Sequence, residues 1–184
     1  MKAVFIDRDG VICDEVNHLH KKKQIRLIQD SASAIRELNR SDYRVIVVTN
    51  QPVVARGLCT EEELKGINSH LEMLLKKEGA LLDAIYYCPH LPAAGNNSRY
   101  MIDCECRKPK PGMLFKAKKD FNIEDLSECF LIGDKTQDIK AGKNAGCKTI
   151  LVKTGYGGKD IAYEVTPDFV AKDLYDAVTK IILK

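Results

Sequence analysis

Short apolar runs alternate with helical patterns along most of this 184-residue chain, and this alternation constrains the fold more than any other feature. The apolar runs predict buried strands over residues 2–7, 44–49, 84–88, 129–133 and 148–153. The segments between and after them predict helices over residues 30–39, 60–79, 112–121, 136–145 and 173–183. Such a chain favours an open, doubly wound α/β fold around a parallel sheet. Chemistry in these folds gathers beyond the carboxyl ends of the strands.

Two of the predicted helices carry clear end signals. Thr60, followed three residues later by Glu63, forms a capping box at the start of the helix over residues 60–79. Gly146 is a C-cap for the helix over residues 136–145. No internal repeat, linker or low-complexity segment interrupts the pattern. We therefore predict one domain over residues 1–184, with no insertion large enough for a cap domain.

Composition narrows the class of protein. The net charge is only +3 and tryptophan is absent, which argues against a nucleic-acid-binding surface. The longest apolar runs, such as residues 45–48, are too short to cross a bilayer. The first residues lack the apolar core and cleavage site of a signal peptide. The seven cysteines are an odd number, which argues against a disulfide framework. We expect a cytoplasmic protein with neither a nucleic-acid nor a membrane partner.

Two acids follow the first predicted strand. Asp7 and Asp9 are two residues apart, and in an extended backbone such positions point the same way. Their carboxylates are therefore predicted to converge, with Gly10 allowing a sharp turn. Like charges this close are unfavourable without a cation, and oxygen ligands favour Mg²⁺. The pair alone is equally compatible with a solvated acidic turn.

Polar residues also follow other predicted strands. The second strand leads into Thr49, Asn50 and Gln51, and the fourth into Asp134, with Asp138 four residues later at the start of a helix. A lysine at position 108 adds a cation. Together with the acids of the first strand, these residues could supply a nucleophile, an acid or base, a metal site and a cationic clamp. That set suits phosphoryl transfer.

Two pairs of metal-type ligands lie in one long loop. Cys88 and His90 form the first pair, and Cys104 and Cys106 form the second. Four such ligands can close a tetrahedral zinc site, and a site with all four positions filled is structural. Unmetallated loop cysteines are the alternative. Because Arg107 follows the last ligand directly, zinc would fix where this residue and the next one point.

The motifs "DRDG", "TNQ", "RKPKPG" and "GDKTQD" resemble the four motifs of the haloacid dehalogenase (HAD) superfamily. The zinc-type loop, together with "ARG" after "TNQ", is similar to that of the D-glycero-D-manno-heptose 1,7-bisphosphate 7-phosphatases. The histidinol-phosphate phosphatases are close relatives and remain an alternative. A zinc-stabilised nucleic-acid-binding module is a second alternative, which would leave the acids unexplained. The resemblance spans residues 4–155 and implies heptose assembly for lipopolysaccharide core or other surface glycans.

The resemblance implies a role for each motif residue. Asp7 would be the nucleophile and Asp9 the general acid and base, while Thr49 and Lys108 would hold the phosphoryl oxygens. Mg²⁺ would be bound by Asp7, the backbone carbonyl of Asp9, and Asp134. Asp138 and Lys135 would contact these residues and hold them in position. The expected substrate contacts are Asn50, Gln51, Arg107 and Lys135.

The chain departs from the family pattern where the sugar is expected. A "D-x-G-Y"-like element is usual after the first motif, but here Asn17 and His18 fall near that position, and we expect them to contact the substrate. Residues 52–54 read "PVV" in place of "SGI". The basic run at residues 21–23 could attract a second phosphate, although a solvated loop is the preferred interpretation. The expected partner is a small sugar bisphosphate bound by a monomer.

Overall fold

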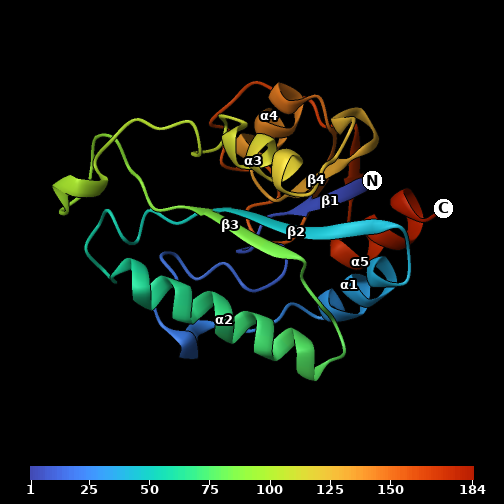
Figure 1. Ribbon diagram of the computed structural model, residues 1–184, viewed down its shortest axis with the longest axis horizontal. Helices are drawn as coiled ribbons and strands as arrows, with labels where there is room; N and C mark the ends of the chain where they lie inside the picture. Colours follow the sequence, from blue (N-terminus) through green and yellow to red (C-terminus); the bar gives the residue numbers. More distant parts are fainter.

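The computed structural model describes all 184 residues and contains one six-stranded sheet (Figure 1). Its strand order is β3-β2-β1-β4-β5-β6, and every neighbouring pair is parallel. The strands are β1 (Lys2–Ile6), β2 (Tyr43–Asn50), β3 (Ala84–Cys88), β4 (Phe130–Gly133), β5 (Lys148–Val152) and β6 (Phe169–Ala171). The doubly wound parallel sheet predicted from the sequence is confirmed.

Helices cover both faces of the sheet (Figure 1). They are α1 (Ser31–Asn39), α2 (Glu61–Lys77), α3 (Gly112–Asp120), α4 (Thr136–Ala145) and α5 (Leu174–Ala177), which continues into a wider turn over Val178–Ile182. The apolar residues of α1, α2 and α5 pack on one face, against alternate residues of β1 and β2 such as Val4 and Val45. Those of α3 pack on the opposite face, against Phe5 and Ile46. The alternation in each central strand therefore supplies two cores.

The predicted elements match the structure within a few residues, and the capping details are also confirmed. The Thr60 side chain accepts a hydrogen bond from the Glu63 backbone, and Gly146 ends α4 at a φ of 82°. The sequence missed β6 because that strand has only three residues, two of them exposed. The predicted final helix is divided into α5 and the wider turn.

The sheet order reverses between β1 and β4, which places a crevice at their carboxyl ends. The connection from β1 to α1 holds only one short 3₁₀ turn (Lys22–Gln24), so no large cap lies over this crevice. Residues 21–23 and Arg26 are exposed, as a solvated loop requires. None of the helices is both long and apolar enough to span a bilayer.

Candidate active site

Three carboxylates meet at the carboxyl ends of β1 and β4. Asp7 follows β1, Asp134 follows β4, and Asp138 lies in the first turn of α4; one oxygen of each lies within 4.8 Å of those of the other two. All three side chains are buried. Asp138 also caps α4, because its Oδ2 accepts a hydrogen bond from the backbone N–H of Lys135 at 3.0 Å.

Two glycines make room for Asp134. Gly10 and Gly155 have φ values of 82° and 58°, and a Cβ on either would overlap the Asp134 carboxylate. The Tyr156 backbone N–H donates to Asp134 Oδ2 at 2.7 Å. The other oxygen of Asp134, Oδ1, is buried and has no hydrogen-bond partner. A buried carboxylate oxygen without a partner is costly, so this atom is a ready cation ligand.

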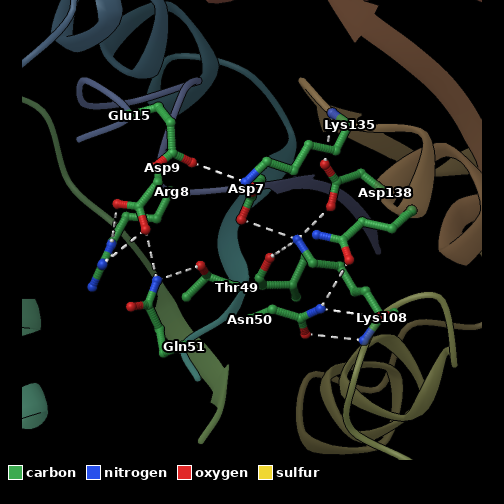
Figure 2. Close-up of polar contacts among 12 residues, drawn as sticks. Asp7, Arg8, Asp9, Glu15, Thr49, Asn50, Gln51, Lys108, Lys135 and Asp138 are labelled. Carbon is green, nitrogen blue, oxygen red and sulfur yellow. Dashed lines mark hydrogen bonds and ion pairs between the residues drawn. The ribbon is translucent and has the colours of Figure 1, made fainter. Parts of the chain in front are cut away.

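The Lys108 ammonium contacts two of these three carboxylates directly. Its Nζ lies 3.0 Å from Asp7 Oδ1 and 2.7 Å from Asp138 Oδ1, and it donates to the Val48 carbonyl at 2.7 Å (Figure 2). The side chain is fully buried. Two ion pairs and one hydrogen bond thus surround the ammonium, so the position of Lys108 is fixed by the protein itself.

The cluster is short of positive charge. Burial, with Asp7 and Asp138 close by, raises the pKa of Asp134 to about 8. Burial also raises the pKa of Asp138 to about 6, even though Lys108 opposes that shift. If all three carboxylates are ionised, the Lys108 ammonium offsets only part of their charge, which, with burial, is why the pKa values of Asp134 and Asp138 are raised. A divalent cation with oxygen ligands, as Mg²⁺ prefers, removes this deficit.

Asp9 does not join this cluster. Its carboxylate receives two hydrogen bonds from the Arg8 guanidinium, at 2.9 and 3.0 Å, and one from Gln51 at 2.8 Å. In Figure 2 it points away from the oxygens of Asp7. The prediction that the Asp7 and Asp9 carboxylates converge is therefore wrong, because the Arg8 charge draws the second carboxylate aside. Burial alone would raise the pKa of Asp9, but the charge and hydrogen bonds of Arg8, together with Gln51, hold it below its usual value.

The polar residues after β2 brace other site residues. Gln51 is buried and also donates to the Thr49 hydroxyl at 3.0 Å. Asn50 pairs with the main chain of Lys108 in both directions, since its Nδ2 donates to the Lys108 carbonyl and its Oδ1 accepts from the Lys108 N–H, each at 3.0 Å. Both also line the cavity described next, so a contact with substrate stays a prediction for them.

A cavity of about 150 Å³ opens beside Asp9. Asn17 and His18, which the sequence predicted near the sugar, line it, as do Lys135 and Tyr156. Asn17 and His18 have φ values of 48° and 73°, so a strained loop presents them to the cavity. The Lys135 ammonium lies 2.8 Å from Glu15 Oε2 and 4.3 Å from the centre of the Tyr156 ring. Glu15 also accepts from the Asn17 N–H, and so joins this loop to α4.

The second predicted metal site also forms. Cys104 Sγ lies 3.5 Å from Cys88 Sγ and 3.2 Å from Cys106 Sγ, and His90 Nδ1 lies 3.7 and 3.4 Å from the sulfurs of Cys88 and Cys106. A tetrahedral zinc ion needs separations of about 3.6–3.8 Å, given Zn–S bonds of about 2.3 Å and Zn–N bonds of about 2.0 Å. The four residues therefore fit structural zinc. Arg107 donates to the His90 carbonyl at 2.9 Å, which ties its guanidinium to this loop.

Comparison with known proteins agrees with this geometry. A family model described as HAD-hydrolase-like matches residues 105–177. The D-glycero-β-D-manno-heptose-1,7-bisphosphate 7-phosphatase of Pasteurella multocida is 42% identical over 84% of this chain and 83% of its own length. The corresponding α-heptose enzyme of Photorhabdus laumondii is 38% identical over 85% of each chain. The D,D-heptose 1,7-bisphosphate phosphatase of B. bronchiseptica, solved with magnesium and phosphate, superposes with a TM-score of 0.86 at 32% identity and covers 100% of this chain and 99% of its own.

This chain belongs to the HAD phosphatase family. Its resemblance to the heptose bisphosphate phosphatases, inferred above from four motifs and a zinc-type loop, is confirmed over almost the whole length. A family member that superposes on the whole chain was solved with magnesium, and the two ligand clusters of this chain fit the two metals expected from the sequence.

Sequence reasoning missed two residues of this phosphatase site. Arg8 lies between Asp7 and Asp9 and has no role in the sequence analysis, although a charged residue at a buried strand end indicates an ion pair. Asn68 lies on the apolar stripe of α2, one turn from Leu64 and Leu71, and its Oδ1 accepts from Arg8 at 2.9 Å. A polar residue on a buried helical face was the signal for it.

Proposed function

We propose that this phosphatase removes the 7-phosphate of D-glycero-D-manno-heptose 1,7-bisphosphate through a phosphorylated Asp7. The observation that carries this proposal is the buried Asp7 carboxylate, which faces Lys108 and two further acids beside a cavity lined by Asp9. We infer the substrate from the relatives that align with most of the chain, which are heptose 1,7-bisphosphate 7-phosphatases.

The reaction has two steps at Asp7. In the first, a carboxylate oxygen of Asp7 attacks phosphorus, the bond from phosphorus to the sugar O7 breaks, and Asp9 gives a proton to that oxygen. The approaching phosphate dianion favours the protonated form of Asp9 because like charges raise a carboxyl pKa. In the second step Asp9 takes a proton from water, which displaces Asp7 and releases inorganic phosphate.

The remaining residues hold the phosphoryl group and the metal. Asp7, Asp134 and the carbonyl of Asp9 would hold Mg²⁺, which screens the repulsion between the nucleophile and the phosphate. Thr49 and Lys108 would stabilise the charge that develops on the phosphoryl oxygens.

The sugar end would occupy the cavity beside Asp9. Asn17, His18 and Lys135 line that cavity and offer polar groups to sugar hydroxyls. Arg107, tied to the zinc loop through His90, would reach the substrate beyond the transferred group. Asn50 and Gln51 line the same wall and would act mainly through the bonds they make to Lys108 and Asp9.

Phosphate release from a substrate panel tests the proposal. The panel contains both anomers of the heptose bisphosphate, since relatives are named for each, together with fructose 1,6-bisphosphate and histidinol phosphate. We expect kcat/KM for one heptose anomer to exceed that for fructose bisphosphate by about 100-fold, or ~3 kcal/mol in transition-state binding. Equal, weak activity on all four compounds would reject heptose as the substrate.

We also propose that the chain acts as a cytoplasmic monomer. All the site residues named above come from one chain, so a single copy suffices. The seven cysteines form no disulfide, and three of them stand with His90 as a set of four zinc-type ligands, which suits a reducing compartment. Light scattering of the purified protein should give the mass of one chain, 20.6 kDa. A stable mass of twice that value would contradict the monomer.

A further inference from the structure

The largest side chain that is completely buried in this protein is an arginine. Arg8 is fully inaccessible to solvent, although its guanidinium carries a charge. Burying such a charge is expensive unless it is paired and hydrogen-bonded. Its position directly between Asp7 and Asp9 therefore calls for an explanation.

The Arg8 guanidinium donates hydrogen bonds to two residues, Asp9 and Asn68. Nε donates to Asp9 Oδ1 at 2.9 Å and Nη2 donates to Asp9 Oδ2 at 3.0 Å, which is a two-pronged pairing of guanidinium and carboxylate. Nη1 donates to Asn68 Oδ1 at 2.9 Å. The fork fixes both the place and the plane of the Asp9 carboxylate, which a single hydrogen bond would not do (Figure 2).

Two weaker constraints complete this arrangement. Gln51 donates to Asp9 Oδ2 at 2.8 Å, and the buried Cys13 thiol donates to Oδ1 at 3.5 Å. Each oxygen of Asp9 thus has one donor from Arg8 and one from another residue. The carboxylate is held against the wall of the cavity that receives the sugar.

Asn68 links this arrangement to α2. It is 6% exposed and lies on the face of the helix that packs on the sheet. Its Oδ1 accepts from Arg8 Nη1, the guanidinium nitrogen that the Asp9 fork does not use, and so anchors the guanidinium on the side away from Asp9. Helix α2 thereby supports Asp9 through the side chain of Arg8.

We propose that Arg8, braced by Asn68, is the positioning residue that holds Asp9 where it meets the leaving oxygen of the substrate. This inference rests on the proposed role of Asp9 as general acid. Arg8 itself does not touch the reacting atoms and acts only through Asp9. The competing explanation is a structural ion pair that stabilises the fold without affecting proton transfer.

The dependence on the leaving group separates these explanations. A sugar alkoxide needs a proton as it departs, whereas p-nitrophenolate departs without one. A displaced Asp9 therefore slows the first step for a sugar phosphate but not for p-nitrophenyl phosphate. The second step is common to both substrates, so the measurement is the first turnover, followed by rapid quench for the sugar and by the p-nitrophenol burst for the aryl ester.

The variants are Arg8→Lys, which keeps the charge and loses the fork, and Asn68→Ala, which keeps Arg8 and removes its brace. Each should lower the first-turnover rate with heptose bisphosphate by about 10- to 100-fold, which is a partial loss of the roughly 100- to 10,000-fold that general acid catalysis contributes. The burst rate with p-nitrophenyl phosphate should change by less than about threefold. If Arg8→Lys does not fold, Asn68→Ala carries the test alone.

Arg36→Gln is the matched control. Arg36 bonds Ser33 and the Glu78 carbonyl near the far end of α2, so its loss affects stability and not Asp9. An equal fall with both substrates, or no fall with either, would overturn the proposal. If the wild-type enzyme rejects heptose bisphosphate, the proposed function fails, and the same ratio measured on whichever alkyl phosphate it hydrolyses still tests Arg8.

Discussion

Asn50 offers the sharpest test of how the site is assembled, because it joins β2 to the residue that pairs with the nucleophile. Its side-chain amide makes two hydrogen bonds of 3.0 Å with the main chain of Lys108, and a third, longer one of 3.4 Å with Gln137 on α4. Asn50→Ala removes all three. The two short bonds are each worth about 1 kcal/mol net, so the free energy of unfolding should fall by ~2 kcal/mol.

That loss has two measurable consequences. For a chain of this length, ~2 kcal/mol corresponds to a fall in Tm of about 4–8 °C. Freeing the Lys108 main chain also loosens its ammonium, which lies 3.0 Å from Asp7. A displacement of about 1 Å at a catalytic group can cost 100-fold in rate, so kcat for phosphate release should fall by about that factor while KM changes little.

Asn144→Ala is the control for this experiment. Asn144 is exposed on α4, and its side-chain amide donates to the carbonyl of Pro109, the residue that follows Lys108. Its removal should change Tm by less than about 2 °C and kcat by less than about twofold, as most exposed substitutions do. Unchanged kcat in Asn50→Ala, or an equal loss in both variants, would refute the reasoning that Asn50 positions Lys108.

Three further predictions follow from the same geometry. Asp7→Asn should abolish phosphate release yet still bind substrate in calorimetry, and normal turnover would exclude Asp7 as the nucleophile. Cys104→Ser should lower the zinc content, measured by mass spectrometry, below one ion per chain. Because zinc fixes the loop that holds Arg107, kcat/KM should fall about 10-fold or more, while the far-UV circular dichroism of the core persists. Full activity without zinc would contradict this prediction. Because the pKa of Asp134 is raised to about 8 in the metal-free protein, a proton competes with Mg²⁺ below that pH. The Mg²⁺ affinity should therefore rise by up to ~10-fold per pH unit towards pH 8 and level off above it, and equal affinities at about pH 6 and about pH 9 would be the contrary result.

Much of this site could be predicted because its residues lie at strand ends. The positions of Asp7, Thr49 and Asp134 depend on the parallel sheet alone, and the sheet follows from the apolar runs. The zinc ligands were equally predictable, since two close pairs of ligands can meet only if the loop between them closes.

The orientation of Asp9 could not be predicted in the same way. Strand geometry places it on the side of Asp7, but an ion pair with Arg8 decides the rotamer, and that arginine is itself fixed by Asn68, which is 60 residues away in the sequence. The contacts of Asp138 were also only partly predictable; the resemblance implied that it supports the residues that touch the substrate. Its capping bond was foreseeable from α4, but its contact with Lys108 depends on how the loop after the zinc site packs.

The central claim is that one particular phosphate is removed from a sugar bisphosphate. Following the reaction of the preferred heptose 1,7-bisphosphate anomer by ³¹P NMR tests it directly, because the anomeric phosphate and the 7-phosphate give separate signals. We predict that, with Mg²⁺ present, the 7-phosphate signal disappears as inorganic phosphate appears, while the anomeric signal persists. Loss of the anomeric phosphate first, or loss of both at the same rate, would contradict the function proposed for this chain.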